Sequence, residues 1–169
     1  MFTKTKRGGR TPSPTCFNCF IMYTVSKTQE GHIPFLVEGM KKLLKMHVAL
    51  DGYYKVPEDG FLEDMLKKDT ISFVALKDGR PVGFARGRCV IDPPDKIESF
   101  VILNDMFVEE EHRGKGVGTL LLEAFGEKAK EEGAKKIELH VDVRNEIGLK
   151  AWEASGFEIH QYRMKKDIT

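Results

Sequence analysis

Apolar residues recur at helical spacing in two stretches of the amino-terminal half, over about residues 31 to 50 and 58 to 68. The inner side of the second stretch is predicted to carry Phe61, Leu62, Met65 and Leu66. The same spacing returns from Val117 to Phe125 and in EIGLKAWEAS, residues 146 to 155. The pattern therefore predicts four helices.

Strand-like runs surround these helices. The first run reads from Phe17 to Val25, and residues 70 to 91 read as two strands joined at Asp78-Gly79, a strong hairpin signal. Further strands are predicted over about 98 to 108, 137 to 141 and 157 to 164. The order β-α-α-β-β-β-α-β-α-β is neither a doubly wound repeat nor all-β. It predicts an α/β (α+β) fold, a mixed sheet flanked by helices.

Composition narrows the class of protein. A chain of 169 residues suits one domain, and 27 basic against 26 acidic side chains argue against a surface devoted to nucleic acid. No run approaches the length of a membrane span, which is about 18 apolar residues. Three cysteines are too few for a disulfide framework. A cytoplasmic protein is expected.

The first 15 residues are basic, rich in Gly, Pro, Ser and Thr, and poor in large apolar groups. Such a segment is expected to be a flexible leader, with a nucleic-acid-binding arm as the alternative, ahead of a single domain over residues 16–169. Cys16 and Cys19 form a lone CxxC. Because Cys89 does not complete a zinc ligand set, no metal is expected.

Glycines alternate in the sequence RGKGVG, from Arg113 to Gly118, between a predicted strand and a predicted helix. A tight turn is the simplest interpretation, but one glycine suffices for a turn. A helix amino terminus presents unpaired amides and partial positive charge, so bare backbone there suits a phosphate or pyrophosphate. Neither the P-loop pattern nor the dinucleotide fingerprint fits these residues.

The pattern Arg-x-x-Gly-x-Gly resembles the [Gln/Arg]-x-x-Gly-x-[Gly/Ala] hallmark of the GNAT superfamily of N-acetyltransferases. The later stretch NEIGLKAWEASGFE is similar to that family's second motif, with Asn145, Gly156 and Phe157 at its defining positions. The resemblance covers roughly residues 70 to 165. It implies a mostly antiparallel sheet of 6–7 strands with about four helices, splayed between the fourth and fifth strands.

The resemblance implies acetyl-CoA as co-substrate, without a metal. The pyrophosphate would lie on the amides of the glycine loop, and the pantetheine would pair with the strand before it. A backbone amide near Val108 would polarise the thioester carbonyl. The coenzyme-binding residues implied are Met106, Phe107, Val108, Arg113, Gly114, Lys115, Gly116, Val117, Gly118, Thr119, Asn145 and Trp152. For Asn145, a plain helix N-cap is the alternative role, and both roles are compatible.

The catalytic groups are less clearly marked. Many family members carry a Tyr that protonates the leaving thiolate where this chain has Trp152, and an indole N–H is no practical acid. The general acid is thus left unassigned, and Trp152 either lines the pocket or packs in the core. Asp105, three residues before Val108, is the candidate general base, with a backbone-satisfied strand-end Asp as the alternative.

The acceptor amine is expected to bind at the segment HVALDGYY, residues 47 to 54. His47 and Asp51 share a helix face, and Tyr53 and Tyr54 follow. A histidine and a carboxylate near tyrosines can hold a cationic amine, although a polar helix end with surface aromatics explains the same residues.

The leading hypothesis is acetyl transfer from acetyl-CoA to a primary amine by direct attack in a ternary complex, with a small-molecule amine favoured. The alternatives are a protein lysine or N-terminal acceptor, a non-catalytic coenzyme A-binding module, and a nucleic-acid-binding protein that uses the basic leader. The expected partners are the coenzyme and the amine. A homodimer stays open, and membranes and nucleic acid are disfavoured.

Overall fold

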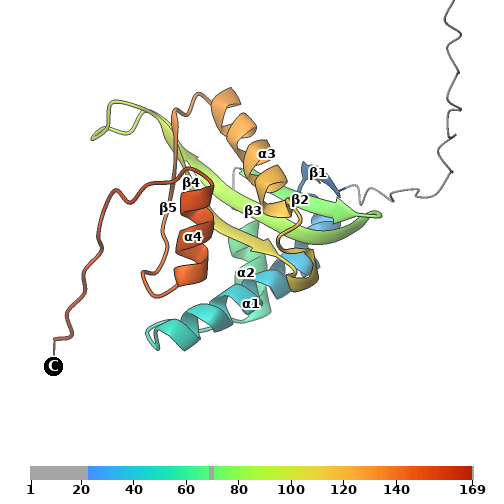
Figure 1. Ribbon diagram of the computed structural model, residues 1–169, viewed down its shortest axis with the longest axis horizontal. Helices are drawn as coiled ribbons and strands as arrows, with labels where there is room; N and C mark the ends of the chain where they lie inside the picture. The colour runs from blue at the N-terminus through green and yellow to red at the C-terminus, as the bar shows by residue number, and fades with distance from the viewer. Residues whose placement is uncertain (1–22, 69–70, 169) are drawn as a thin grey trace, which may run out of the picture.

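The computed structural model describes residues 23–68 and 71–168. Its centre is a sheet of five strands in the order β1-β2-β3-β4-β5 (Figure 1). The strands are β1 (Tyr23–Lys27), β2 (Ile71–Lys77), β3 (Arg80–Val90), β4 (Phe100–Val108) and β5 (Lys136–Leu139). β1 to β4 pair antiparallel and β5 joins β4 in parallel, which confirms a mixed, mostly antiparallel sheet.

The strand count is lower than the 6–7 expected. The predicted strand over 157 to 164 is wrong, because Phe157–Ile168 contains no helix or strand in the structure. Residues 17 to 22 of the predicted first strand lie outside the described residues, and its remainder forms the start of β1. A strand-like sequence shows that a segment could lie on a sheet, but a strand forms only where its backbone pairs with a neighbour, and residues 157–168 pair with no strand of the described chain.

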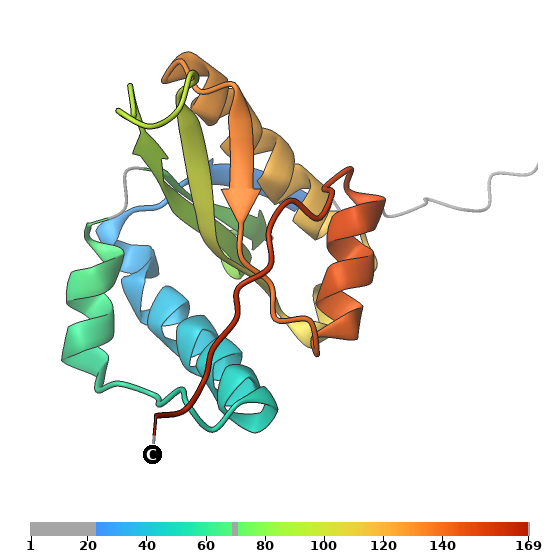
Figure 2. The same ribbon diagram turned by 90° about the vertical axis from the view of Figure 1, so that its left-hand side faces the viewer.

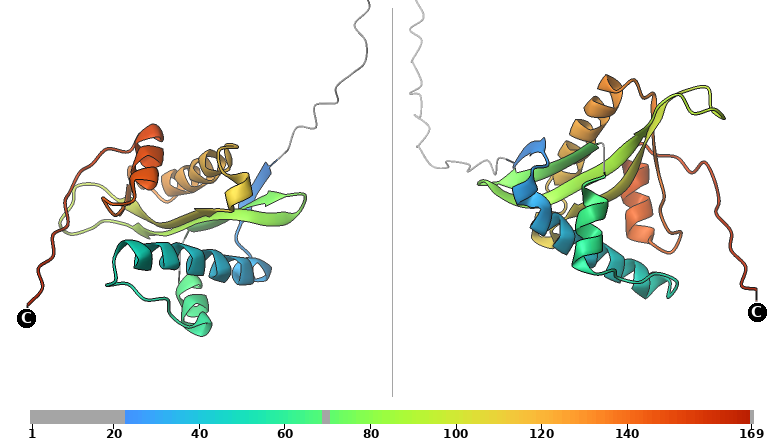
Figure 3. Two further views of the ribbon diagram at one scale, coloured as in Figure 1. Left: turned by 60° about the horizontal axis from the view of Figure 1, so that its bottom comes forward. Right: turned by 180° about the vertical axis from the view of Figure 1, so that it is seen from behind.

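Helices cover both faces of the sheet (Figure 3). One face carries α1 (Ile33–Leu50), which follows the short 3-10 helix η1 (Glu30–His32), and α2 (Asp59–Leu66). The other face carries α3 (Val117–Glu131) and α4 (Glu146–Ala154). The four predicted helices are thus confirmed, within a few residues at each end.

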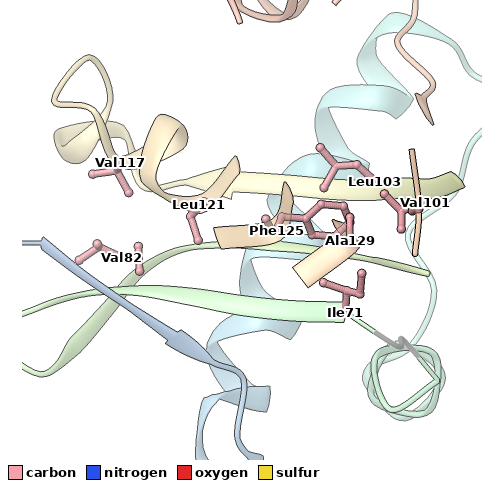
Figure 4. Packing of buried hydrophobic residues seen from close by; sticks show 11 residues of the cluster. Ile71, Val82, Val101, Leu103, Val117, Leu121, Phe125 and Ala129 are labelled. Atoms are coloured by element: carbon pink, nitrogen blue, oxygen red, sulfur yellow. The ribbon is translucent and has the colours of Figure 1, made fainter. Parts of the chain in front are cut away.

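Two apolar clusters hold these layers together. Under α3, the buried side chains include Val101, Val117, Leu121 and Phe125 (Figure 4). Under α1 and α2, they include Leu36, Met40, Leu62, Leu66, Phe84 and Phe107. Phe61, predicted to face inward, is 63% exposed, so α2 buries a narrower stripe than its sequence suggested.

The β2–β3 turn has the conformation that its sequence predicted. Asp78 and Gly79 both have positive φ, at 51° and 75°. A two-residue hairpin turn with both φ angles positive matches the twist of the flanking strands, and Asp-Gly is suited to it. The turn fixes the register of β3, and β3 in turn positions β4.

Candidate active site

β4 departs from regular pairing near its middle. The β3–β4 register shifts between Arg86, which faces Asp105, and Gly87, which faces Leu103. β5 pairs with β4 only from Phe100 to Leu103. Residues 105–108 therefore extend beyond β5, and their backbone groups on that side face no strand within the described chain. This opening agrees with the predicted splay between the fourth and fifth strands.

The glycine loop lies at the end of this extension. After β4 the chain forms a 3-10 helix, η2 (Glu110–His112), and then enters α3 with Gly116 as its N-cap. Gly114 and Gly116 have φ of 68° and 82°, and beyond the adjacent residues no described atom lies within 4 Å of where a Cβ would be at either glycine. Gly116 has no side chain to cap the first amides of α3. The loop thus presents bare backbone amides at a helix amino terminus.

Side chains fix the loop to the sheet. Arg113 Nε donates to the Val108 carbonyl at 2.9 Å, and Lys115 Nζ donates to the Glu111 carbonyl at 2.6 Å. Nδ1 of His112, in η2, lies 3.0 Å from the Tyr23 hydroxyl. A residue of β1 therefore supports η2, directly before the glycines.

Gly116→Ala and Gly118→Ala should change stability in opposite directions. A side chain at the left-handed Gly116 should destabilise the fold by about 1–2 kcal/mol. At Gly118, an added methyl meets only Met106 Cε, at an ordinary 3.5 Å, and alanine should stabilise α3 by about 0.5–1 kcal/mol. Thermal unfolding measures both. Equal shifts in the midpoint would contradict a conformational requirement at Gly116.

Two side chains near the end of β4 pack into the apolar clusters. Phe107 is 3% exposed and packs against Phe84 with ring centroids 5.7 Å apart. Met106 packs on the cluster under α3. In this segment the backbone, and not these two side chains, is what a ligand alongside β4 can contact.

Asp105 contacts Arg86 on the neighbouring strand. Arg86 Nε and Nη2 approach Oδ2 of Asp105 at 2.8 and 2.7 Å. The side chains of Arg86 and Asp105 are 4% and 15% exposed. Within the described residues, Arg86 is the one buried charged residue. The candidate base is thus a largely buried carboxylate oriented by a guanidinium.

Asn145 begins α4 as its N-cap. Its side-chain Oδ1 accepts a hydrogen bond from the Gly148 amide at 3.0 Å, which confirms the capping role. Trp152, one of the implied coenzyme residues, is half-buried against the cluster under α3. Its ring meets Phe157 edge-on, with centroids 5.4 Å apart. Trp152 therefore packs against the core, as the alternative role predicted.

The cap predicts a stability difference between two variants. Asn145→Ala removes the acceptor for the Gly148 amide and should destabilise the protein by about 1 kcal/mol, or about 2–4 °C in Tm. Asn145→Asp keeps an acceptor oxygen at the helix start and should remain near the parent Tm. Calorimetric unfolding compares the two, and an unchanged Tm for Asn145→Ala would rule out a stabilising cap.

The predicted acceptor residues gather at the carboxy-terminal end of α1. The rings of His47 and Tyr54 lie 5.6 Å apart, and those of Tyr53 and Tyr54 6.0 Å apart. Asp51 Oδ1 accepts the Tyr53 amide at 3.2 Å. These four residues therefore form one patch, as their spacing predicted.

Asp51 joins this patch to two distant segments. Its Oδ2 accepts hydrogen bonds from Arg144 Nη2, at 3.1 Å, and from Lys165 Nζ. Lys165 also lies 5.3 Å from the centroid of the Tyr53 ring. Lys165 above all, together with the Tyr53 amide, lowers the pKa of Asp51 to about 2. Asp51 is thus an ionised carboxylate held between two cations.

Arg144 is committed mainly to Asp142. Its Nε and Nη2 contact the two carboxylate oxygens of Asp142 at 2.8 and 2.6 Å. This pairing lowers the pKa of Asp142 and raises that of Arg144.

Sequence reasoning missed Arg86, Arg144 and Lys165. Arg86 pairs with Asp105 on the neighbouring strand. Arg144 and Lys165 both contact Asp51 from distant parts of the chain. No local pattern signals the Arg86–Asp105 pair, because the Asp78-Gly79 hairpin aligns β3 with β2 and not with β4.

Two absences apply to the described part of the chain. No group of three or more His, Cys, Asp and Glu side chains suited to a metal ion occurs within it. Cys16 and Cys19 lie outside these residues. Nor does any helix among residues 23–68 and 71–168 have the length and apolar character that a membrane span requires.

Comparison with known sequences connects this geometry to a family. Residues 40–157 match the model of the acetyltransferase (GNAT) family. An uncharacterized N-acetyltransferase of Methanocaldococcus jannaschii is 26% identical over 146 residues, which are 84% of this chain and 63% of that protein. The chain thus spans less than two thirds of the length of this relative.

Solved structures share the fold. A mutant of a Bacillus halodurans protein superposes with a TM-score of 0.76 at 17% identity, over 86% of this chain and 99% of the other. An aminoglycoside N-acetyltransferase in complex with CoA gives a TM-score of 0.70 at 22% identity, over 87% and 95% of the two chains. At these identities the likeness concerns the fold alone.

Proposed function

The chain belongs to the acetyltransferase (GNAT) family, and on that premise we propose that it transfers an acetyl group from acetyl-CoA to a primary amine. The observation that carries this proposal is the glycine loop at the start of α3, directly after the part of β4 that extends beyond β5. An anion-binding helix terminus beside a strand edge suits a ligand with a pyrophosphate and an amide-bearing arm. The CoA complex of the aminoglycoside enzyme with this fold supports the same donor.

In this proposal the residues act in three groups. The amides of Arg113 to Thr119 hold the pyrophosphate, and the backbone of Met106 to Val108 aligns the pantetheine. The Val108 amide stabilises the oxyanion that forms when the amine attacks the thioester carbonyl. Asp105, oriented by Arg86, removes a proton from the attacking amine directly or through a water.

Direct attack is preferred to an acyl-enzyme. Cys89, the one cysteine among the described residues, lies on β3 opposite Val101 and packs, partly buried, against the cluster under α3. It is therefore placed as a core residue and not at the end of β4, where the thioester would lie. The leaving thiolate would take its proton from water, since Trp152 cannot supply one.

A titration and an acceptor screen test the proposal together. Calorimetry should show acetyl-CoA binding, and a thiol-release assay over a panel of small amines should show turnover with some of them. Absence of binding would reject the donor site. Tight binding with background thiol release over the whole panel, including lysine peptides, would instead indicate a non-catalytic coenzyme-binding module.

A further inference from the structure

The carboxy-terminal segment, residues 157–168, runs past the end of α1 without forming regular structure (Figure 2). Beyond Phe157, the hydrogen bonds, ion pairs and ring contacts between its side chains and the rest of the described chain are those of Lys165, with Asp51 and with the ring of Tyr53. One ammonium group thus attaches this segment to the patch predicted to bind the acceptor.

Apart from Lys165, the ion-paired groups around Asp51 carry one negative charge that is not balanced. Asp51 and Asp142 supply two negative charges, and Arg144 supplies one positive charge that Asp142 engages through both carboxylate oxygens. Without Lys165 the group would carry one negative charge in excess, on Asp51. Asp51 is 16% exposed, so that charge is partly shielded from water, whereas the Lys165 side chain is 62% exposed. The structure therefore pairs a fixed carboxylate with a replaceable ammonium.

We propose that Asp51 and Tyr53 form a subsite for an ammonium group of the acceptor, and that Lys165 occupies this subsite in cis. The inference rests on the proposed acetyl transfer. A carboxylate binds an ammonium group through charge-assisted hydrogen bonds, and an aromatic face binds it through a cation–π interaction. Lys165 makes both contacts here, with Asp51 and with Tyr53.

The chemistry of the subsite specifies the class of acceptor. An ammonium group paired with Asp51 carries three N–H donors and no lone pair, so it is not the nucleophile. The nitrogen that attacks the thioester must be a second one, deprotonated at the end of β4. The acceptor is therefore a small molecule with at least two amino groups, one for recognition and one for reaction.

Diamines and matched monoamines test this inference. The probes are 1,4-diaminobutane to 1,8-diaminooctane and the linear monoamines of equal length, assayed by thiol release. Lys165→Ala should lower the KM of the diamines about two- to fivefold, the range expected for an exposed ion pair, and leave kcat and the monoamine KM unchanged. Lys166→Ala is the matched control, since Lys166 makes no hydrogen bond or ion pair within the described residues.

Asp51→Asn supplies the complementary variant. It should raise the KM of diamines and not of monoamines, and adding Lys165→Ala to it should change nothing further. The subsite is overturned if Lys165→Ala leaves the diamine KM unchanged, or if it alters monoamines and diamines alike.

A measurement without turnover separates this inference from the proposed function. The Cε resonance of Lys165, followed by NMR, should shift on addition of diamine. The shift should be absent in Asp51→Asn and absent on addition of the uncharged diol of equal length, which carries no ammonium group. A protein that acetylates no amine but shows the displacement would reject the proposed function and keep the subsite. A protein that acetylates amines but does not show the displacement of Lys165 would keep the proposed function and reject the subsite.

Discussion

An Asp105→Asn variant should bind CoA as the parent protein does and lose about 10²- to 10⁴-fold in kcat, the contribution typical of a general base. Coenzyme affinity should persist because Asp105 lies on the side of β4 that packs toward α1, together with Phe107, whereas the glycine loop begins α3 on the other side. Thiol release gives kcat and calorimetry gives the Kd for CoA.

Stability needs a control, because Asp105 also neutralises Arg86. Breaking a buried ion pair by removing one partner typically destabilises by about 3–5 kcal/mol. The double variant Arg86→Gln, Asp105→Asn replaces two charges with two amides and should recover much of the Tm. If Asp105 is the base, the kcat of the double variant stays as low as that of Asp105→Asn alone. Recovery of kcat along with Tm would show that Asp105 only holds Arg86.

Gly87→Ala should give the largest loss of stability from a single methyl group. The added Cβ would lie 2.0 Å from the Ile102 carbonyl oxygen and 2.8 Å from Phe125 Cζ. The backbone oxygen belongs to the paired strand, so relief requires β3 and β4 to separate where their register shifts. Overpacking of this kind should cost about 3 kcal/mol or more, a fall of about 6–12 °C in Tm.

Gly126→Ala is the control for this variant. Gly126 lies within α3, and a methyl group there would meet Ile137 Cδ1 at an ordinary 3.7 Å. Alanine should therefore stabilise the helix by about 0.5–1 kcal/mol. A Gly87→Ala protein with the parent Tm would mean that the strands adjust freely at the register shift.

Local chemistry made much of the fold predictable. Asp78-Gly79 specified a turn with two positive φ angles, and the structure has both. The glycines before Val117 indicated an exposed helix start, and Gly116 is an N-cap without a side chain. In each case the residues that carry the signal also make the structure, so neighbouring sequence was sufficient.

Pairings between distant segments were not predictable in this way. Asp105 was recognised by its place before Val108, but its partner Arg86 depends on the β3–β4 register and on the shift within it. Lys165 reaches Asp51 across 114 residues of chain. The strand expected over 157 to 164 is wrong for the same reason, because a local pattern describes one segment and not whether that segment pairs with another.

The order of the strands has a consequence for how the protein is made. Each pair of neighbours in the sheet is also a pair of successive strands, so a chain growing from its amino terminus can add every strand to one already present. The β4–β5 pair alone is parallel and needs the α3 crossover before it closes. The glycine loop opens that crossover. During synthesis, the antiparallel part of the sheet can therefore assemble well before the glycine loop and α3 are in place.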